Sequence, residues 1–439
     1  MTNEEKSALS TQFSRFLWSS VLITLSGCLG NVVDGIIVGN LIGQDGVSAI
    51  NLSKPVVQLY MTLNLLLGMG ASMIVGKAFG KKDNARAIYI FTLALIINLV
   101  IGVFFTIVGL SANASVARLL CNNDQLLVQS EDYLLPMLLG APAYMMMWTL
   151  SAMISVDGSP RLASMAIIID NAVNLLLDIV FISLFGWGIT GSSLATVMGH
   201  LVGIAIMLRH FKYKNNHLHL TLKHDRTEFL NIISQGAPLA VASVCLTLLL
   251  LTANTTVLST LGRSGIFAFA VCMNLLQIYN LFVAGTCRTL QSLGAIQAGT
   301  GNNEAFSLVV HKSLRFITIA MGITCLIVLI WPSAITLLFG ADDAASVAEC
   351  NYALRIFALS FIPFCYIYVL MIIYKLYGQH GMALFISFAL SLTVIPVLWL
   401  MARMLPQYIW YSYLIAYLIE AIIIYVIHKT QHLRFELKQ

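Results

Sequence analysis

The sequence predicts an all-α integral membrane protein with twelve transmembrane helices in two six-helix lobes related by a parallel repeat. First, 59% of the 439 residues are hydrophobic and only 10% are charged, whereas soluble domains carry about 25% charged residues. Second, apolar runs of about 20 residues, long enough to cross a bilayer as a helix, follow one another along the chain. Third, the two halves match when one is shifted by 219 residues. Soluble and nucleic-acid-binding classes are excluded despite the net charge of +5.

The first predicted span, 16–38, follows the polar start MTNEEKSALSTQFSR. Because many spans follow it, we interpret this run as an uncleaved first helix and not as a signal peptide. The runs are continuous and do not alternate with polar residues, so spanning strands are not expected. The other predicted spans are 47–75, 87–110, 132–156, 161–185, 191–209, 229–259, 265–289, 312–332, 350–376, 381–403 and 408–428.

Lysines and arginines predict the orientation, because cytoplasmic loops are enriched in them. They gather near both termini and in every second loop, for example at 77–86 and 209–226. The intervening loops contain mainly acids, among them Asp45, Asp124 and Asp342. Both termini are therefore expected on the cytoplasmic side of the cell membrane. That arrangement requires an even number of spans, and twelve satisfies it.

An internal repeat organises the chain, since a shift of 219 or 220 residues superimposes identical residues. The matched pairs include Gly43 with Gly262, Ala49 with Ala268, Tyr60 with Tyr279, Asp124 with Asp343, and Gly158 with Gly378. Each half contains six predicted spans, so both halves enter the membrane from the same side. Transporters built from such parallel repeats bind substrate between or inside the halves.

The repeat defines the predicted domains: an N-terminal lobe at 1–210, a cytoplasmic linker at 211–228 and a C-terminal lobe at 229–439. The linker is the longest polar stretch in the chain. We interpret the histidines in and beside it as parts of a solvated linker, because no further metal-ligand pattern accompanies them. They are His210, His217, His219 and His224.

Ionisable groups inside spans are costly and usually mark a pathway. Asp34 lies in the first predicted span, and Asp170, Asn174 and Asp178 lie in the fifth. The spacing of four residues places the last three on one helical stripe. From the helix rise, Asp34 and Asp178 each lie roughly 25–30 Å from the cytoplasmic ends of their helices.

Thr196 and Tyr133 begin their spans on the same external side, so they are expected to converge with Asp34 and Asp178. Two neighbouring carboxylates in a poorly hydrated pocket can take up a proton, or can hold Na⁺ with help from amide and hydroxyl oxygens. Interhelical hydrogen bonding is the alternative role. It stays open for Asn174 and Thr196, whereas a functional role is favoured for the two acids.

The proposed constellation occurs in one half of the repeat only. At the positions that correspond to Asp34, Asn174 and Asp178, the second half contains apolar residues. These residues are Ala253, Val394 and Leu398. The predicted site is therefore one-sided.

Other features carry less weight. Lys54 lies about 10 Å inside the second span, where it either pairs with Asp34 or extends its ammonium outward. A disulfide between Cys121 and Cys350 and two unpaired thiols both remain open. No ATP-binding or hydrolytic motif occurs in the chain. We therefore expect no enzyme activity and no cofactor.

Three segments together resemble the multidrug and toxic compound extrusion (MATE) family, in particular its DinF-like branch. They are VVDGIIVGNLIGQDGVSAINLSKPVVQLY, GASMIVGKAFGKKDNARA and DGSPRLASMAIIIDNAVNLLLDIVFISLFGWGITGSSLAT. The resemblance implies two six-helix lobes around a cleft, alternating access, and export of mostly cationic compounds driven by H⁺ or Na⁺. It also implies a first-lobe cation site at Asp34, Asn174, Asp178 and Thr196, with Tyr133 nearby.

The sequence departs from the family pattern at three positions. Asp170 adds an acid, Lys54 adds a cation, and Ser151 stands where some relatives have asparagine. The expected function is antiport of small organic cations across the cell membrane, with a monomer as the default. A flippase for lipid-linked oligosaccharides is the first alternative, and a membrane-embedded enzyme or receptor is the second.

Overall fold

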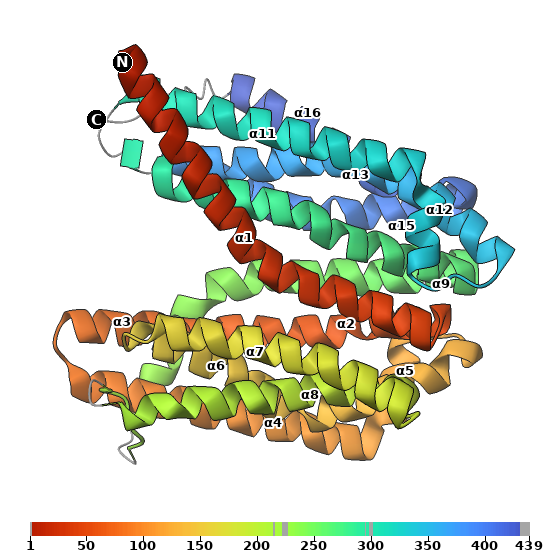
Figure 1. The fold of residues 1–439 in the computed structure, drawn as a ribbon, viewed down its shortest axis with the longest axis horizontal. Helices are drawn as coiled ribbons and strands as arrows, with labels where there is room; N and C mark the ends of the chain where they lie inside the picture. Colours follow the sequence, from red (N-terminus) through yellow and green to blue (C-terminus); the bar gives the residue numbers. More distant parts are fainter. Residues whose placement is uncertain (1, 214–215, 222–226, 295, 298–301, 431–439) are drawn as a thin grey trace. The chain divides into compact units, whose positions relative to one another are not determined.

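The computed structural model describes residues 2–213, 216–221, 227–294, 296–297 and 302–430. These residues form helices joined by short turns, with no strand among them (Figure 1). The α-helices are α1 (Asn3–Leu41), α2 (Gln44–Asn64), α3 (Gly70–Gly80), α4 (Asn84–Leu120), α5 (Asp124–Leu139), α6 (Ala141–Val156), α7 (Pro160–Ile179), α8 (Gly188–Met207), α9 (Thr227–Thr289), α11 (Asn303–Ile330), α12 (Pro332–Leu338), α13 (Ala344–Leu376), α14 (His380–Leu392), α15 (Val394–Met404) and α16 (Tyr411–Thr430). Short π-helical and 3-10 segments adjoin them at η1 (Leu65–Met69), η2 (Val180–Leu184), η3 (Leu208–Lys212), η4 (Leu290–Gly294) and η5 (Pro406–Tyr408).

The described part of the chain contains nine helices long and apolar enough to cross a membrane, and the bent pair α5 and α6 makes a tenth crossing. One of the nine, Leu239–Thr289, has 51 residues. It breaks at Gly262, where φ is 67°, and at 1.5 Å per residue it is long enough for two crossings. With the 39 residues of α1, twelve crossings result, as the sequence predicts.

The fourth predicted span, 132–156, is wrong in its start and in its continuity. Helix α5 begins at Asp124 because the side chain of Asn123 accepts hydrogen bonds from the backbone of Gln125 and Leu126 at 3.0 and 3.4 Å. The crossing then bends by 53°. At Gly140, between α5 and α6, a Cβ would lie 2.3 Å from the side chain of Val197. This close approach to α8 depends on tertiary packing, which the local pattern does not contain.

The repeat extends to the backbone conformation. Gly43 and Gly262, which are 219 residues apart, both have positive φ, at 100° and 67°. Gly158 and Gly378, which are 220 apart, also have positive φ, at 87° and 76°. Glycine adopts this region without the steric cost that other residues incur. Equivalent turns in the two halves therefore depend on the same residue type.

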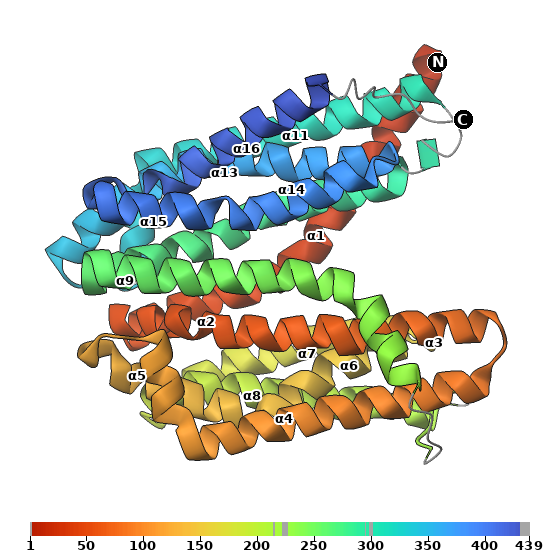
Figure 2. The same ribbon diagram turned by 180° about the vertical axis from the view of Figure 1, so that it is seen from behind.

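The helices pack into two compact units (Figures 1 and 2). Unit 1 consists of Met1–Ile36 and Thr256–Gln439, and unit 2 of Ile37–Thr255. These two units are defined by which residues pack together, whereas the predicted lobes are defined by the repeat in the sequence, so the two sets of boundaries are not comparable. The lobe boundaries predicted above therefore stay a prediction.

Polar side chains join the first part of α9 to α2 within unit 2. Asn51 donates to the side chain of Asn254 at 2.9 Å, and Asn254 donates to the backbone oxygen of Asn51 at 2.8 Å. Gln58 donates to the hydroxyl of Ser243 at 2.9 Å. Paired polar groups of this kind hold membrane helices together. They explain why residues before Thr256 pack with unit 2.

In unit 1 the first part of α1 is held by an ion pair, a hydrogen bond and close packing. The ammonium of Lys6 forms an ion pair with the carboxylate of Glu304 at 2.6 Å, and Lys312 donates to the hydroxyl of Ser10 at 2.6 Å. A Cβ at Gly285 would lie 2.6 Å from the side chain of Val21. The start of α1 therefore lies at the end of unit 1 where α11 begins (Figure 1).

Candidate functional site

Helices α7 and α8 form an antiparallel hairpin that carries most of the predicted site (Figure 1). Gly186 in the turn between them and Gly188 at the start of α8 both have positive φ. Trp187 packs its ring on Phe181, with the centroids 5.0 Å apart. Glycine-rich, aromatic turns of this kind let the chain reverse within a few residues. The polar stripe of α7 is thereby brought against α8.

Asn174 and Thr196 meet across this hairpin. The side-chain amide of Asn174 donates to the hydroxyl of Thr196 at 3.2 Å, and that hydroxyl donates to the backbone oxygen of Ser192 at 3.3 Å. Asp178, four residues further along α7, has an exposed fraction of 0%. An acid so deeply buried in an apolar hairpin needs polar or cationic partners.

A second polar contact lies one helical turn from the first. Asp170, four residues before Asn174, accepts from Nδ1 of His200, four residues after Thr196, with distances of 3.0 and 3.1 Å to its two oxygens. Only 4% of Asp170 and 7% of His200 is exposed. The sequence predicts Asp170 as a secondary candidate but does not identify His200.

Small residues on α8 make this contact possible. At Gly199 a Cβ would lie 2.6 Å from a carboxylate oxygen and 2.8 Å from the backbone oxygen of Asp170. At Gly203 a Cβ would lie 2.6 Å from the side chain of Met147. Glycine at both positions lets α7 and α6 approach α8 closely. The buried acid therefore lies directly against the α8 backbone.

The remaining predicted residues lie outside the hairpin. Tyr133 of α5 is buried against Ala49, Met137 and Ile189. Lys54 of α2 is half-buried. Asp34 is half-buried on α1 and belongs to unit 1, whereas the other predicted site residues belong to unit 2. The predicted proximity of Asp34 to Asp178 therefore stays a prediction, as does its pairing with Lys54.

The histidines near the linker form a clasp with Asp157, at the end of α6. The carboxylate of Asp157 accepts from Nε2 of His210 at 2.8 Å and from Nδ1 of His217 at 3.0 Å. It also accepts from the backbone of His217 and Leu218 at 3.1 and 3.2 Å. His210 is only 1% exposed, so the solvated-linker interpretation is wrong for this residue.

The other linker histidines differ in exposure. His217 and His219 are exposed, and His224 lies outside the described residues. In the described part of the chain, no group of three His, Cys, Asp or Glu side chains is arranged to hold a metal ion.

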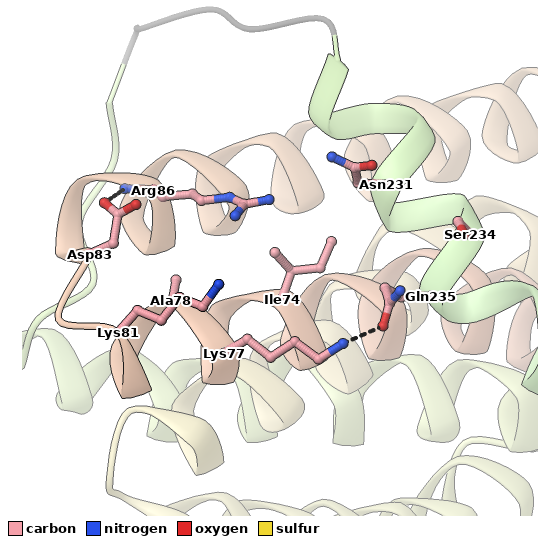
Figure 3. A pocket seen from close by; sticks show the side chains of 9 residues that line it. All are labelled: Ile74, Lys77, Ala78, Lys81, Asp83, Arg86, Asn231, Ser234 and Gln235. Carbon is pink, nitrogen blue, oxygen red and sulfur yellow. Dashed lines mark hydrogen bonds between the residues drawn. The ribbon is translucent and has the colours of Figure 1, made fainter.

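A basic recess of about 220 Å³ lies beside the turn between α3 and α4 (Figure 3). Arg86 forms a two-point ion pair with Glu228, with distances of 2.7 and 3.0 Å, and Lys77 donates to Gln235 at 2.7 Å. These contacts join the turn to the start of α9. None of the predicted site residues lines the recess.

Cys121 and Cys350 are both buried and unbridged. Cys121 follows the last residue of α4, and its thiol donates to the backbone oxygen of Asn123 at 3.4 Å. Burial raises the pKa of the Cys121 thiol, which lowers its reactivity at neutral pH. The structure therefore favours two unpaired thiols over a disulfide.

The sequence pattern of the MatE family matches residues 19–180 and 238–400, which are most of the chain. The chain belongs to the MATE family. This is a family of transporters, and the chain is a multi-pass membrane protein.

Two relatives named multidrug export protein MepA are similar over most of their length. The one from Staphylococcus haemolyticus is 22% identical over 85% of this chain and 84% of its own. The one from Staphylococcus saprophyticus is 21% identical over 90% of this chain and 88% of its own.

Solved structures of transporters have the same fold as this MATE chain. A multidrug resistance MATE transporter in an inward-facing conformation superimposes with a TM-score of 0.83 at 18% identity, covering 94% of this chain and 98% of that one. A transporter from Pyrococcus furiosus, described as a member of the MOP superfamily with a binding pocket of reversed polarity, superimposes with a TM-score of 0.71 at 19% identity, covering 95% of both chains. The assignment to the DinF-like branch of the MATE family stays a prediction.

Proposed function

We propose that this MATE protein is a secondary active antiporter, which exports small organic cations in exchange for H⁺ or Na⁺ by alternating access. It acts in the cell membrane with both termini in the cytoplasm. The observation that carries the proposal is the buried polar stripe of the α7–α8 hairpin, with Asp178 fully buried one turn from the Asn174–Thr196 contact. In a transporter, charge at that depth is costly unless it serves a pathway.

Each side chain has a defined role in this proposal. Asp34 and Asp178 are the coupling pair, which binds either the ion or the organic cation. Asn174 and Thr196 supply neutral oxygens to the ion, and Tyr133 lines the same region. Because the ion and the substrate both neutralise the acids, each displaces the other, and this competition produces exchange. One chain contains all of these groups, so a monomer suffices.

The names of the relatives support this proposal over its alternatives. Both staphylococcal proteins compared above are called multidrug export proteins. A flippase for lipid-linked oligosaccharides, the first alternative, is not favoured by them.

Replacing one acid tests the proposal. We expect Asp178→Asn to remain folded but to lose gradient-driven transport, because the amide cannot exchange a cation. Ethidium efflux from proteoliposomes under an imposed pH or Na⁺ gradient should fall about tenfold or more. The matched control is Asp342→Asn, which removes an exposed carboxylate outside the hairpin. Wild-type efflux by folded Asp178→Asn would exclude the assignment.

A further inference from the structure

Asp170 and His200 form a buried ionisable pair that the proposed exchange does not use. Nδ1 of His200 lies within 3.1 Å of both carboxylate oxygens. Asp170 is about 15 Å along α7 from Pro160, near the middle of a hydrocarbon core of about 30 Å. Ionisable groups at this depth mark proton or ion pathways.

We propose that Asp170 and His200 form a second cation-binding site in unit 2 and that its cation is a proton. The inference rests on the proposed function, because it names an ion that the same hairpin binds. Imidazole nitrogen binds a proton readily, whereas hard metal cations prefer oxygen ligands. The site is therefore a proton site and not a Na⁺ site.

The hydrogen bond determines where the proton binds. A carboxylate only accepts hydrogen bonds, so Nδ1 of His200 carries the hydrogen in its contact with Asp170. Nε2 is then the free basic atom of a neutral imidazole, and among the described residues it has no hydrogen-bond partner. In that state the pair has a net charge of −1. A proton on Nε2 gives imidazolium beside carboxylate, with no net charge.

Neutralisation is favourable at this position, because an uncompensated charge is expensive away from water. The ring of Tyr144 meets the imidazole edge-on at 4.9 Å and takes the place of solvent on that side. The pair is therefore built to hold one proton and to release it when the environment becomes more polar.

Among the described residues on the elements packed against α8, no other charged group takes the place of this proton. The titratable and charged residues on the elements packed against α8 are Asp124, Glu131, Asp132, Tyr133, Tyr144, Arg161, Asp170, Asp178, Arg209, His210 and Lys212. Of these, Asp170 and Tyr144 contact His200. The basic members Arg161 and Arg209 lie nine positions from Asp170 and His200 on their own helices, about 13 Å along the axis.

The proton site is electrically coupled to the proposed exchange site. Along the hairpin, Asn174 is about 6 Å and Asp178 about 12 Å from the level of Asp170. At an effective dielectric constant of about 20, unit charges about 12 Å apart alter each other's binding constants roughly tenfold. A proton on the pair therefore weakens cation binding at Asp178 about tenfold, which helps to release the cation bound there.

The first test observes proton binding without transport. In folded protein labelled with ¹⁵N-histidine, the His200 signals are identified by their loss in His200→Asn. We expect them to move when the buffer is changed from alkaline to acidic, because Nε2 then gains a proton. In Asp170→Asn, which keeps an oxygen to accept from Nδ1, the same movement should require a more acidic buffer. His200 signals that do not move with pH would overturn the proposal.

The second test measures transport. His200→Asn keeps a donor to Asp170 but removes Nε2, and we expect it to reduce efflux driven by a pH gradient about tenfold while ethidium binding is retained. The control is His311→Asn, which removes an exposed histidine of α11. Unchanged pH-driven efflux in folded His200→Asn would overturn the proposal. If wild type transports nothing, the proposed function fails, and the histidine signals still decide the proton site.

Discussion

At the residue scale, Gly199 decides whether α7 and α8 can lie close enough for the polar contacts to form. A Cβ there would meet both the carboxylate and the backbone of Asp170 at less than 3.0 Å. We expect Gly199→Ala to destabilise the protein by about 1–3 kcal/mol, because a backbone atom cannot move aside as a flexible side chain can. Thermal unfolding in detergent measures this effect.

Gly322→Ala is the matched control for that measurement. It lies inside α11, where nothing is within 4 Å of the added methyl group. Its unfolding temperature should be unchanged or slightly higher, since alanine favours a helix over glycine. Equal unfolding temperatures for the two variants would contradict the close contact at Gly199.

The sequence also sets a limit to residue-level prediction. The stripe of Asp170, Asn174 and Asp178 was predictable, because helical periodicity is local. His200 was missed, because its partner depends on the register between two helices. One signal was available: His200 follows Thr196 by four residues, as Asp170 precedes Asn174 by four. Given the Asn174–Thr196 contact in an antiparallel hairpin, the second contact follows.

At the element scale, the Asp157 clasp joins the end of α6 to the chain that follows α8. We expect Asp157→Ala to free this segment, because four donors lose this carboxylate at once. Of the four, the backbone of Leu218 keeps a second acceptor, the side-chain oxygen of Asn216 at 2.8 Å. Loss of buried hydrogen bonds costs about 1–3 kcal/mol, so trypsin should cleave after Lys212 roughly tenfold faster or more.

His219→Ala is the control for the clasp. It removes an exposed histidine of the same segment and leaves Asp157 with its partners. Its cleavage rate should match wild type. Equal cleavage of Asp157→Ala and wild type would show that the clasp does not hold the linker.

Some helix boundaries are marked in the local sequence, whereas others depend on tertiary packing. The break of α9 at Gly262 falls in the gap between the predicted spans 229–259 and 265–289, because glycine and polarity mark it locally. The bend at Gly140 was not predicted, since it accompanies the approach of Val197 from α8. Apolar runs therefore give the number of crossings, whereas packing sets their ends and bends.

At the scale of the whole molecule, the two halves of the repeat exchange their first segments. Residues 1–36 pack with 256–439, and 220–255, which correspond to 1–36 at the 219-residue shift, fall in the unit 37–255. The first segment of each half thus packs with the body of the other half. The repeat was visible in the sequence, but this exchange was not, because it depends on contacts between distant segments.

If the protein exchanges an organic cation for an ion, transport run in reverse should move that ion against no gradient of its own. Vesicles containing the protein and indicators for internal pH and Na⁺ receive an ethidium gradient and no ion gradient. We expect ethidium movement to drive H⁺ or Na⁺ in the opposite direction, and Asp34→Asn/Asp178→Asn to abolish that ion movement. Ethidium transport by wild type with no counter-movement of either ion would contradict antiport.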